Sequence, residues 1–138
     1  MQISPEVLEF SKTVLPQYID TAKTYGHLGV GALVLSIGFK EKVLGEVGRK
    51  SVTVLLVIAW FLFLLTVGAS ALYPYLAVKL MEYNLTGAEE MPYPLSWSPL
   101  FWPGIWYGIM LISFFLGALL LVVGSARQLF ATKFSSRR

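Results

Sequence analysis

The sequence contains no cysteine and one histidine among its 138 residues, which excludes disulfides, thiolate metal sites and cysteine nucleophiles. Charged residues make up only 14%, well below the roughly 25% usual in soluble domains. Catalytic signatures such as HExxH, GxSxG, a P-loop or paired carboxylates beside a base are also missing. We therefore predict that the chain is not an enzyme and has no catalytic, cofactor-binding or metal-binding residues.

Charge is absent from two long apolar runs, one between Lys50 and Lys79 and the other between Glu90 and Arg127. A helix needs about 20 mostly apolar residues to cross the roughly 30 Å of hydrocarbon in a bilayer. Both runs exceed that length, and 56% of the whole chain is hydrophobic. These features predict an all-α integral membrane protein that forms a single membrane domain, residues 1–138. The lipid bilayer is therefore an expected partner of the protein.

Three transmembrane helices are expected, at residues 24–44, 51–79 and 104–126. The first is the shortest, because its uncharged part, Thr24 to Phe39, covers only about 24 Å as a helix. We interpret it as a span that begins near Lys23, whose aliphatic side chain lets the ammonium group reach the membrane–water interface. A re-entrant or tilted interfacial segment is the alternative.

Residues 4–23 are expected to form an amphipathic interfacial helix ahead of these spans. Apolar and charged residues fall on opposite sides of its helical wheel, as in helices that lie on a membrane surface or bind a partner. Packing against the protein's own bundle explains the same pattern. Pro16 disfavours helical geometry at Leu15, so a kink or a break is expected there.

Residues 80–103 form the predicted Pro- and Trp-rich interfacial loop, and residues 127–138 the basic tail. Aromatic and basic residues near helix ends are typical anchors at lipid headgroups. The expected interface anchors are Trp97, Trp102, Trp106, Lys40, Lys42, Arg49, Lys50 and Arg127. The basic residues flank the apolar runs instead of forming one patch, so no nucleic-acid partner is predicted.

Charge placement predicts the orientation. The segment from Lys40 to Lys50 carries net charge +2 and the tail is basic, whereas the loop from Lys79 to Glu90 carries net charge −2. Positive residues stay cytoplasmic, so with three spans the N-terminus lies outside and the C-terminus lies in the cytoplasm. We expect the prokaryotic inner membrane.

Small residues recur at spacings that bring membrane helices into close contact. The candidates are Gly29, Ala32, Ser36, Gly104, Gly108, Ser113, Gly117 and Gly124. They fit packing inside the bundle and an oligomer interface alike. His27 is the remaining candidate functional residue, because an ionisable side chain within a span is a functional hypothesis by default. Its expected place near the outer end of the first span equally fits an interfacial, hydrogen-bonded histidine.

The segment GALVLSIGF from Gly31 to Phe39, followed by a short charged loop and a span containing Ala59, Trp60 and Phe61, resembles small, uncharacterised, multi-spanning prokaryotic membrane proteins. That resemblance covers about residues 25–80 and implies no activity. The three-span topology with a basic tail is also similar to that of some phage holins. The amphipathic first helix and the long aromatic loop depart from the holin pattern.

These observations predict a small multi-pass membrane protein that acts by association, as a homo-oligomer or as the membrane subunit of a larger complex. Self-association or another membrane protein is the expected partner. A holin-like pore and a carrier of small molecules or ions are the alternatives.

Overall fold

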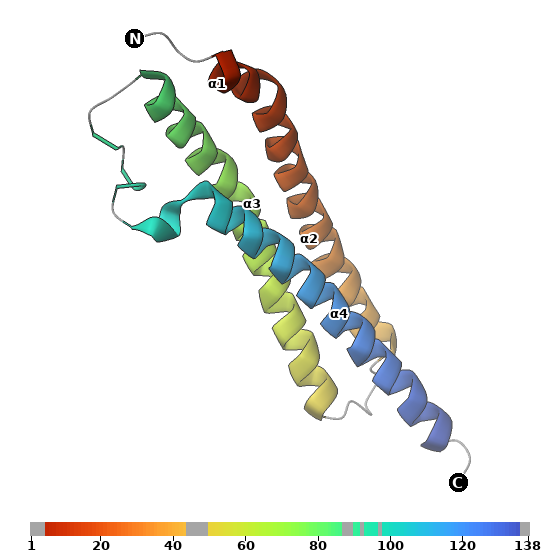
Figure 1. Ribbon diagram of the computed structural model, residues 1–138. Coiled ribbons are helices and arrows are strands. Elements are labelled where there is room, and N and C mark those ends of the chain that lie inside the picture. Colours follow the sequence, from red (N-terminus) through yellow and green to blue (C-terminus); the bar gives the residue numbers. More distant parts are fainter. Residues whose placement is uncertain (1–4, 44–49, 87–89, 92, 97, 136–138) are drawn as a thin grey trace.

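The computed structural model describes residues 5–43, 50–86, 90–91, 93–96 and 98–135, and within these ranges every regular element is helical. The helices are α1 (Pro5–Glu9), the π-helical turn η1 (Phe10–Val14), α2 (Leu15–Val43), α3 (Lys50–Thr86), the 3₁₀ turn η3 (Pro99–Phe101) and α4 (Pro103–Ser135). The predicted all-α class is confirmed. Three long helices dominate the molecule, and α3 runs antiparallel to both α2 and α4 (Figure 1).

Two helices of the described chain are long and apolar enough to cross a membrane, Val54–Thr86 in α3 and Pro103–Arg127 in α4. The predicted count of three such helices is therefore too high. α2 is long, but Asp20, Lys23 and His27, together with several glycines, lower its hydropathy. Length and composition thus single out α3 and α4.

The structure does not confirm the predicted interfacial helix at 4–23, and within the described residues no loop separates it from the predicted span at 24–44. α1, η1 and α2 follow one another without an intervening loop, and α2 begins at Leu15 and continues to Val43. Pro16 has no N–H to donate to the preceding turn. The helix accommodates it with the wider η1 turn, in which the Leu15 N–H donates to the Phe10 carbonyl five residues earlier.

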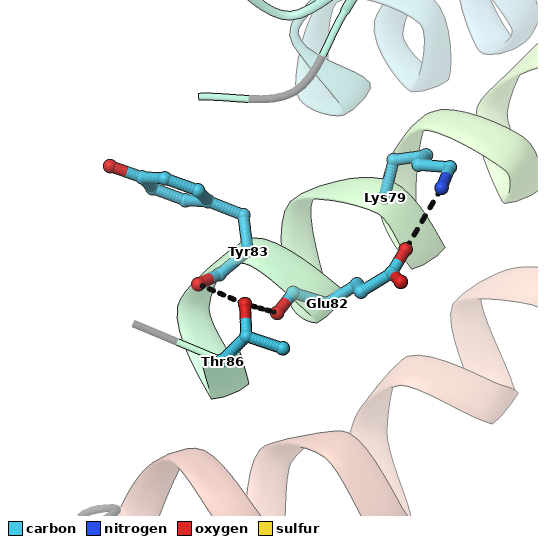
Figure 2. A network of polar contacts seen from close by, with 4 residues as sticks. All are labelled: Lys79, Glu82, Tyr83 and Thr86. Carbon is cyan, nitrogen blue, oxygen red and sulfur yellow. Dashed lines mark hydrogen bonds and ion pairs between the residues drawn. The ribbon is translucent and has the colours of Figure 1, made fainter. Parts of the chain in front are cut away.

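The ends of α3 and α4 extend beyond the predicted spans. α3 continues to Thr86, so residues 80–86, which were expected in the loop, are helical. An ion pair between Lys79 and Glu82, with a 2.9 Å Nζ to Oε2 distance, and a hydrogen bond from the Thr86 hydroxyl to the Glu82 carbonyl accompany this last turn (Figure 2). α4 likewise continues to Ser135, through most of the expected basic tail.

Ser98 and Pro103 shape the entry into α4. The Ser98 hydroxyl accepts a hydrogen bond from the Leu100 N–H and caps η3, and Trp102 then adopts an extended conformation. Pro103 occupies the first position of α4, where its missing N–H costs no intrahelical hydrogen bond. The chain therefore enters α4 through a capped turn.

Most buried residues recur three, four or seven positions apart along each long helix. Among the described side chains they are, in α3, Leu56, Ala59, Phe63, Thr66, Ala69, Ser70, Tyr73, Leu76 and Ala77; in α2, Ala22, Gly26, Gly29 and Ser36; and in α4, Pro103, Met110, Ser113, Gly117 and Gly124. This is the seven-residue spacing of left-handed helix packing. The core is a set of narrow seams along α3, and most members on α2 and α4 are small.

Candidate functional site

The seam between α2 and α3 depends on two glycines. A Cβ at Gly26 would overlap the Ser70 hydroxyl oxygen and lie 3.2 Å from the Ser70 Cβ atom. A Cβ at Gly29 would lie 3.2 Å from the Val67 Cγ2 atom and 3.5 Å from the Phe63 carbonyl oxygen. Such approaches let van der Waals contacts hold membrane helices together, because no water is available to drive apolar association.

The seam between α3 and α4 closes on Gly117. A Cβ at this position would lie 3.2 Å from the Phe63 ring, 3.3 Å from the Leu62 Cβ atom and 3.4 Å from the Ala59 carbonyl oxygen. Further along α4, a Cβ at Gly124 would lie at an ordinary 3.9 Å from the Leu55 Cβ atom. Gly117 is therefore the tightest point that glycine provides between these two helices.

Among the described residues, four hydroxyl side chains are buried at these seams and are hydrogen-bonded; one of them, Ser70 of α3, donates to the Val67 carbonyl. Thr66 of α3 and Ser113 of α4 lie 2.8 Å apart, and each is also within reach of a carbonyl of its own helix. Ser36 of α2 accepts a 2.6 Å hydrogen bond from the Trp60 indole N–H of α3 and donates to the Leu33 carbonyl. A polar contact thus joins α3 to α2, and another joins α3 to α4.

Aromatic rings gather toward one end of the bundle, with one tyrosine from each long helix. The Tyr107 ring lies 5.3 Å from that of Tyr18 and 5.2 Å from that of Tyr73, in edge-on and tilted arrangements that aromatic pairs prefer. Trp106 packs beside this cluster, and its Nε1 atom is buried without a hydrogen-bond partner in the described structure. The rings contact one another and join α2, α3 and α4 at this level.

The predicted small-residue positions divide into two groups. Gly29, Ser36, Ser113, Gly117 and Gly124 are buried at helix contacts, and Ala32 is half-buried. No atom outside the local helix lies within 4 Å of a Cβ built on Gly104 or Gly108. The GxxxG pair of α4 therefore does not form a seam within the described chain.

The predicted anchors lie in differing surroundings. Trp102 is 47% exposed at the start of α4, Arg127 is exposed, and Trp106 is half-buried against the core. Trp97 and Arg49 lie outside the described residues, as do the side chains of Lys40, Lys42 and Lys50.

His27 is exposed on α2, and no described residue hydrogen-bonds to it or forms an ion pair with it. Gly26 faces Ser70 and Gly29 faces Phe63 and Thr66, so His27 lies beside the part of α3 between Thr66 and Ser70. The sequence could not show this level, because it depends on how α2 is aligned against α3.

Two contacts were missed by sequence reasoning, the fit of Gly26 against Ser70 and the bond between Ser36 and Trp60. The contact at Gly26 could have been predicted from the sequence, because Ala22, Gly26, Gly29 and Ser36 follow a seven-residue spacing and share one helix face. Within the described residues no group of three or more His, Cys, Asp or Glu side chains could hold a metal ion.

No family model, curated protein or solved structure matches this chain. The function must therefore be argued from the arrangement of its own residues.

Proposed function

We propose that the chain is a three-span protein of the prokaryotic inner membrane that acts by association, with itself or with another membrane protein, and not by catalysis. Its N-terminus is outside and its C-terminus is cytoplasmic. Charge placement and the antiparallel order of α2, α3 and α4 together support this orientation.

The exterior of α3 and α4 supports a membrane location. Only 33% of the most apolar window of α3 and 22% of that of α4 is buried inside the structure. Large side chains such as Phe61 and Ile112, which are 72% and 69% exposed, point away from the core. A soluble protein rarely exposes so continuous an apolar surface, whereas hydrocarbon solvates it well.

α2 completes three spans because it packs along the apolar part of α3. Its contacts extend from Gly26, opposite Ser70, to Ser36, opposite Trp60. A bilayer that surrounds the middle of α3 must therefore surround this part of α2 too. The modest hydropathy of α2 is then tolerable only if some of its surface is shielded from lipid.

The outward side of α2 provides the main support for association with another protein surface. It exposes His27 and two glycines, Gly31 and Gly38, at a level where α3 and α4 expose large apolar side chains. Polar residues in membrane helices almost always face protein or a water-filled cavity. Contact with another protein surface satisfies this requirement.

Topology is tested by single cysteines, which the chain lacks naturally. In intact cells an impermeant thiol reagent should label cysteines replacing Gln2 and Glu90 and spare one replacing Glu46. Labelling of Glu46→Cys alone would invert the orientation. Protection of Gln2→Cys, with Glu90→Cys labelled, would show that α2 does not cross.

Association is tested by counting protomers in nanodiscs formed directly from the membrane. We expect two or more copies of a fluorescently tagged chain in each disc, or a stoichiometric second membrane protein. A single chain alone in each disc, at native expression, would overturn the proposal. Discs prepared from a known monomeric three-span protein provide the control for random co-capture.

A further inference from the structure

Exposed aromatic residues with a polar tip lie at one end of the bundle, one for each long helix. They are Tyr18 of α2, Tyr75 of α3 and Trp102 just before α4, and they are 42%, 54% and 47% exposed. Tyrosine and tryptophan are enriched where a membrane meets water, because the ring is apolar while the hydroxyl or indole N–H can reach polar groups. We call these three residues the aromatic band.

Ring contacts place the aromatic band at one level along the bundle. The Tyr107 ring lies 5.3 Å from that of Tyr18 and 5.2 Å from that of Tyr73, so α2, α3 and α4 are aligned there. At 1.5 Å per residue, Tyr75 is about 3 Å along its helix from Tyr73, and Trp102 is about 8 Å along the chain from Tyr107. The three band residues therefore occupy a layer roughly as thick as the headgroup region of one leaflet.

An exposed ion pair beside the band indicates polar surroundings at this level. The Lys23 Nζ atom lies 3.6 Å from the Asp20 Oδ1 atom, and the two side chains are 62% and 77% exposed. Asp20 is about 3 Å along α2 from Tyr18. Lys23 is one turn nearer the centre of the bundle, but its side chain extends back toward Asp20. Hydrocarbon solvates neither charge, so the apolar layer ends close to this pair.

The length of each helix from the band to its opposite end matches the thickness of a bilayer. The first basic residues at the opposite end are Lys40 in α2, Lys50 in α3 and Arg127 in α4. They are about 33 Å, 37 Å and 37 Å along the chain from the band residue of the same helix. The hydrocarbon layer is about 30 Å thick, and the bilayer with its headgroups about 40–45 Å. Both ends therefore fit within headgroup layers.

We propose that phospholipid headgroups of the outer leaflet surround the bundle at the aromatic band. The proposal rests on the proposed three-span function, because the orientation of the spans defines which leaflet is the outer one. The Tyr18 and Tyr75 hydroxyls and the Trp102 indole N–H donate hydrogen bonds to ester or phosphate oxygens of the lipids. Their rings contact the ends of the acyl chains nearest the headgroups.

The distribution of the band favours lipid over a protein partner. A single partner protein would cover one side of the bundle, whereas a bilayer surrounds all three helices, and a band residue is exposed on each of them. The ion pair of Asp20 and Lys23 carries no net charge, and the sequence has no Lys or Arg between Lys79 and Arg127. The band therefore requires no anionic headgroup.

The helices that continue past the band then extend outside the bilayer. α1, η1 and the start of α2 extend about 20 Å beyond Tyr18, and the end of α3 extends about 17 Å beyond Tyr75. Glu9 and Glu82 are exposed on these two extensions, where water can solvate their carboxylates. The same end of the molecule thus has a polar part beyond the band and an apolar part on its other side.

Spin-label depth measurements in liposomes test the level of the band. Single cysteines replace the three band residues and, ten residues nearer the opposite end of the same helices, Leu28, Leu65 and Ile112, which are 49%, 45% and 69% exposed. Collisions of each attached nitroxide with oxygen, which concentrates in hydrocarbon, and with a water-soluble nickel chelate give its depth. The band labels should lie in the headgroup layer and the matched labels roughly 15 Å deeper.

Labels that replace Glu9 and Glu82 provide the aqueous reference. They should collide with the nickel chelate several-fold more often than the band labels do. The depth of the band should be the same in phosphatidylcholine liposomes with and without phosphatidylglycerol, because the band has no net charge. A band that reaches the headgroups only when anionic lipid is present would overturn the proposal.

The outcomes distinguish this proposal from the proposed function. Band labels as accessible to nickel as those at positions 9 and 82, or as deep as those at 28, 65 and 112, would overturn the band and leave three spans standing. Band labels shielded from both reagents would show that a protein covers the band and would overturn it in the same way. Aqueous exposure of the label at position 28 would remove α2 from the membrane and overturn both.

Discussion

The hydroxyls of Thr66 and Ser113 lie 2.8 Å apart in the seam between α3 and α4, and both residues are almost completely buried. Either hydroxyl can donate to the other, because the acceptor can in turn donate to a carbonyl of its own helix. The pair is therefore satisfied in both arrangements. It places a polar contact at the level where the three helices meet.

This relationship predicts a measurable coupling between the two residues. Thr66→Val and Ser113→Ala should each lower the free energy of unfolding in a bilayer by about 0.5–1 kcal/mol. In a double-mutant cycle the coupling should be roughly 0.6 kcal/mol. Steric trapping in bicelles measures these quantities. Additive single effects would show that the hydroxyls do not stabilise one another.

Gly117 should tolerate a side chain poorly. Gly117→Leu must displace the Phe63 ring or separate the backbones at Ala59, and overpacking of this kind costs about 1–3 kcal/mol. Gly108→Leu is the matched control, because no neighbour lies within 4 Å of its Cβ position. Thermal unfolding in detergent compares the two. Equal stability of both variants would contradict the seam described between α3 and α4.

The bond from the Trp60 indole to Ser36 should hold the far part of α2 against α3. Trp60→Phe keeps an aromatic ring but removes the N–H donor, and Ser36→Ala removes the acceptor. Hydrogen exchange of the α2 amides around Ser36 should rise by a similar factor in either variant and no further in the double variant. A larger rise in the double variant would indicate two independent effects.

The purified protein should not release dye from liposomes. The exposed faces of α3 and α4 are dominated by large apolar side chains, and the buried hydroxyls are hydrogen-bonded within the bundle. A wide aqueous channel needs a continuous polar lining that these helices do not provide. Leakage that increases with the protein-to-lipid ratio, against a melittin positive control, would favour the holin-like pore instead.

The sequence alone was sufficient to predict the helical class and the two apolar helices. Each signal is local, since a charge-free run of sufficient length is favourable in hydrocarbon whatever it packs against. α3 continues past residue 79, where the second span was predicted to end. Lys79 and Glu82 are spaced three residues apart on this helix and pair with each other, which favours its continuation to Thr86.

The small residues of the seams could also be found in the sequence, but their partners could not. The spacing of Ser113, Gly117 and Gly124 indicates a shared face, and so does that of Gly104 and Gly108. Only the first face packs against α3, because contact depends on which side of α4 the chain presents after the turn at Pro103.

The sequence by itself determined that this protein has two helices apolar enough for a membrane and a weaker, more polar one before them. Only the tertiary structure decided where the weaker helix lies. Packing of Gly26 and Gly29 against α3 places His27 beside the part of α3 between Thr66 and Ser70 and leaves its side chain exposed. Hydropathy is a sum over neighbours in the chain, whereas the level and direction of a side chain depend on contacts between residues far apart in it.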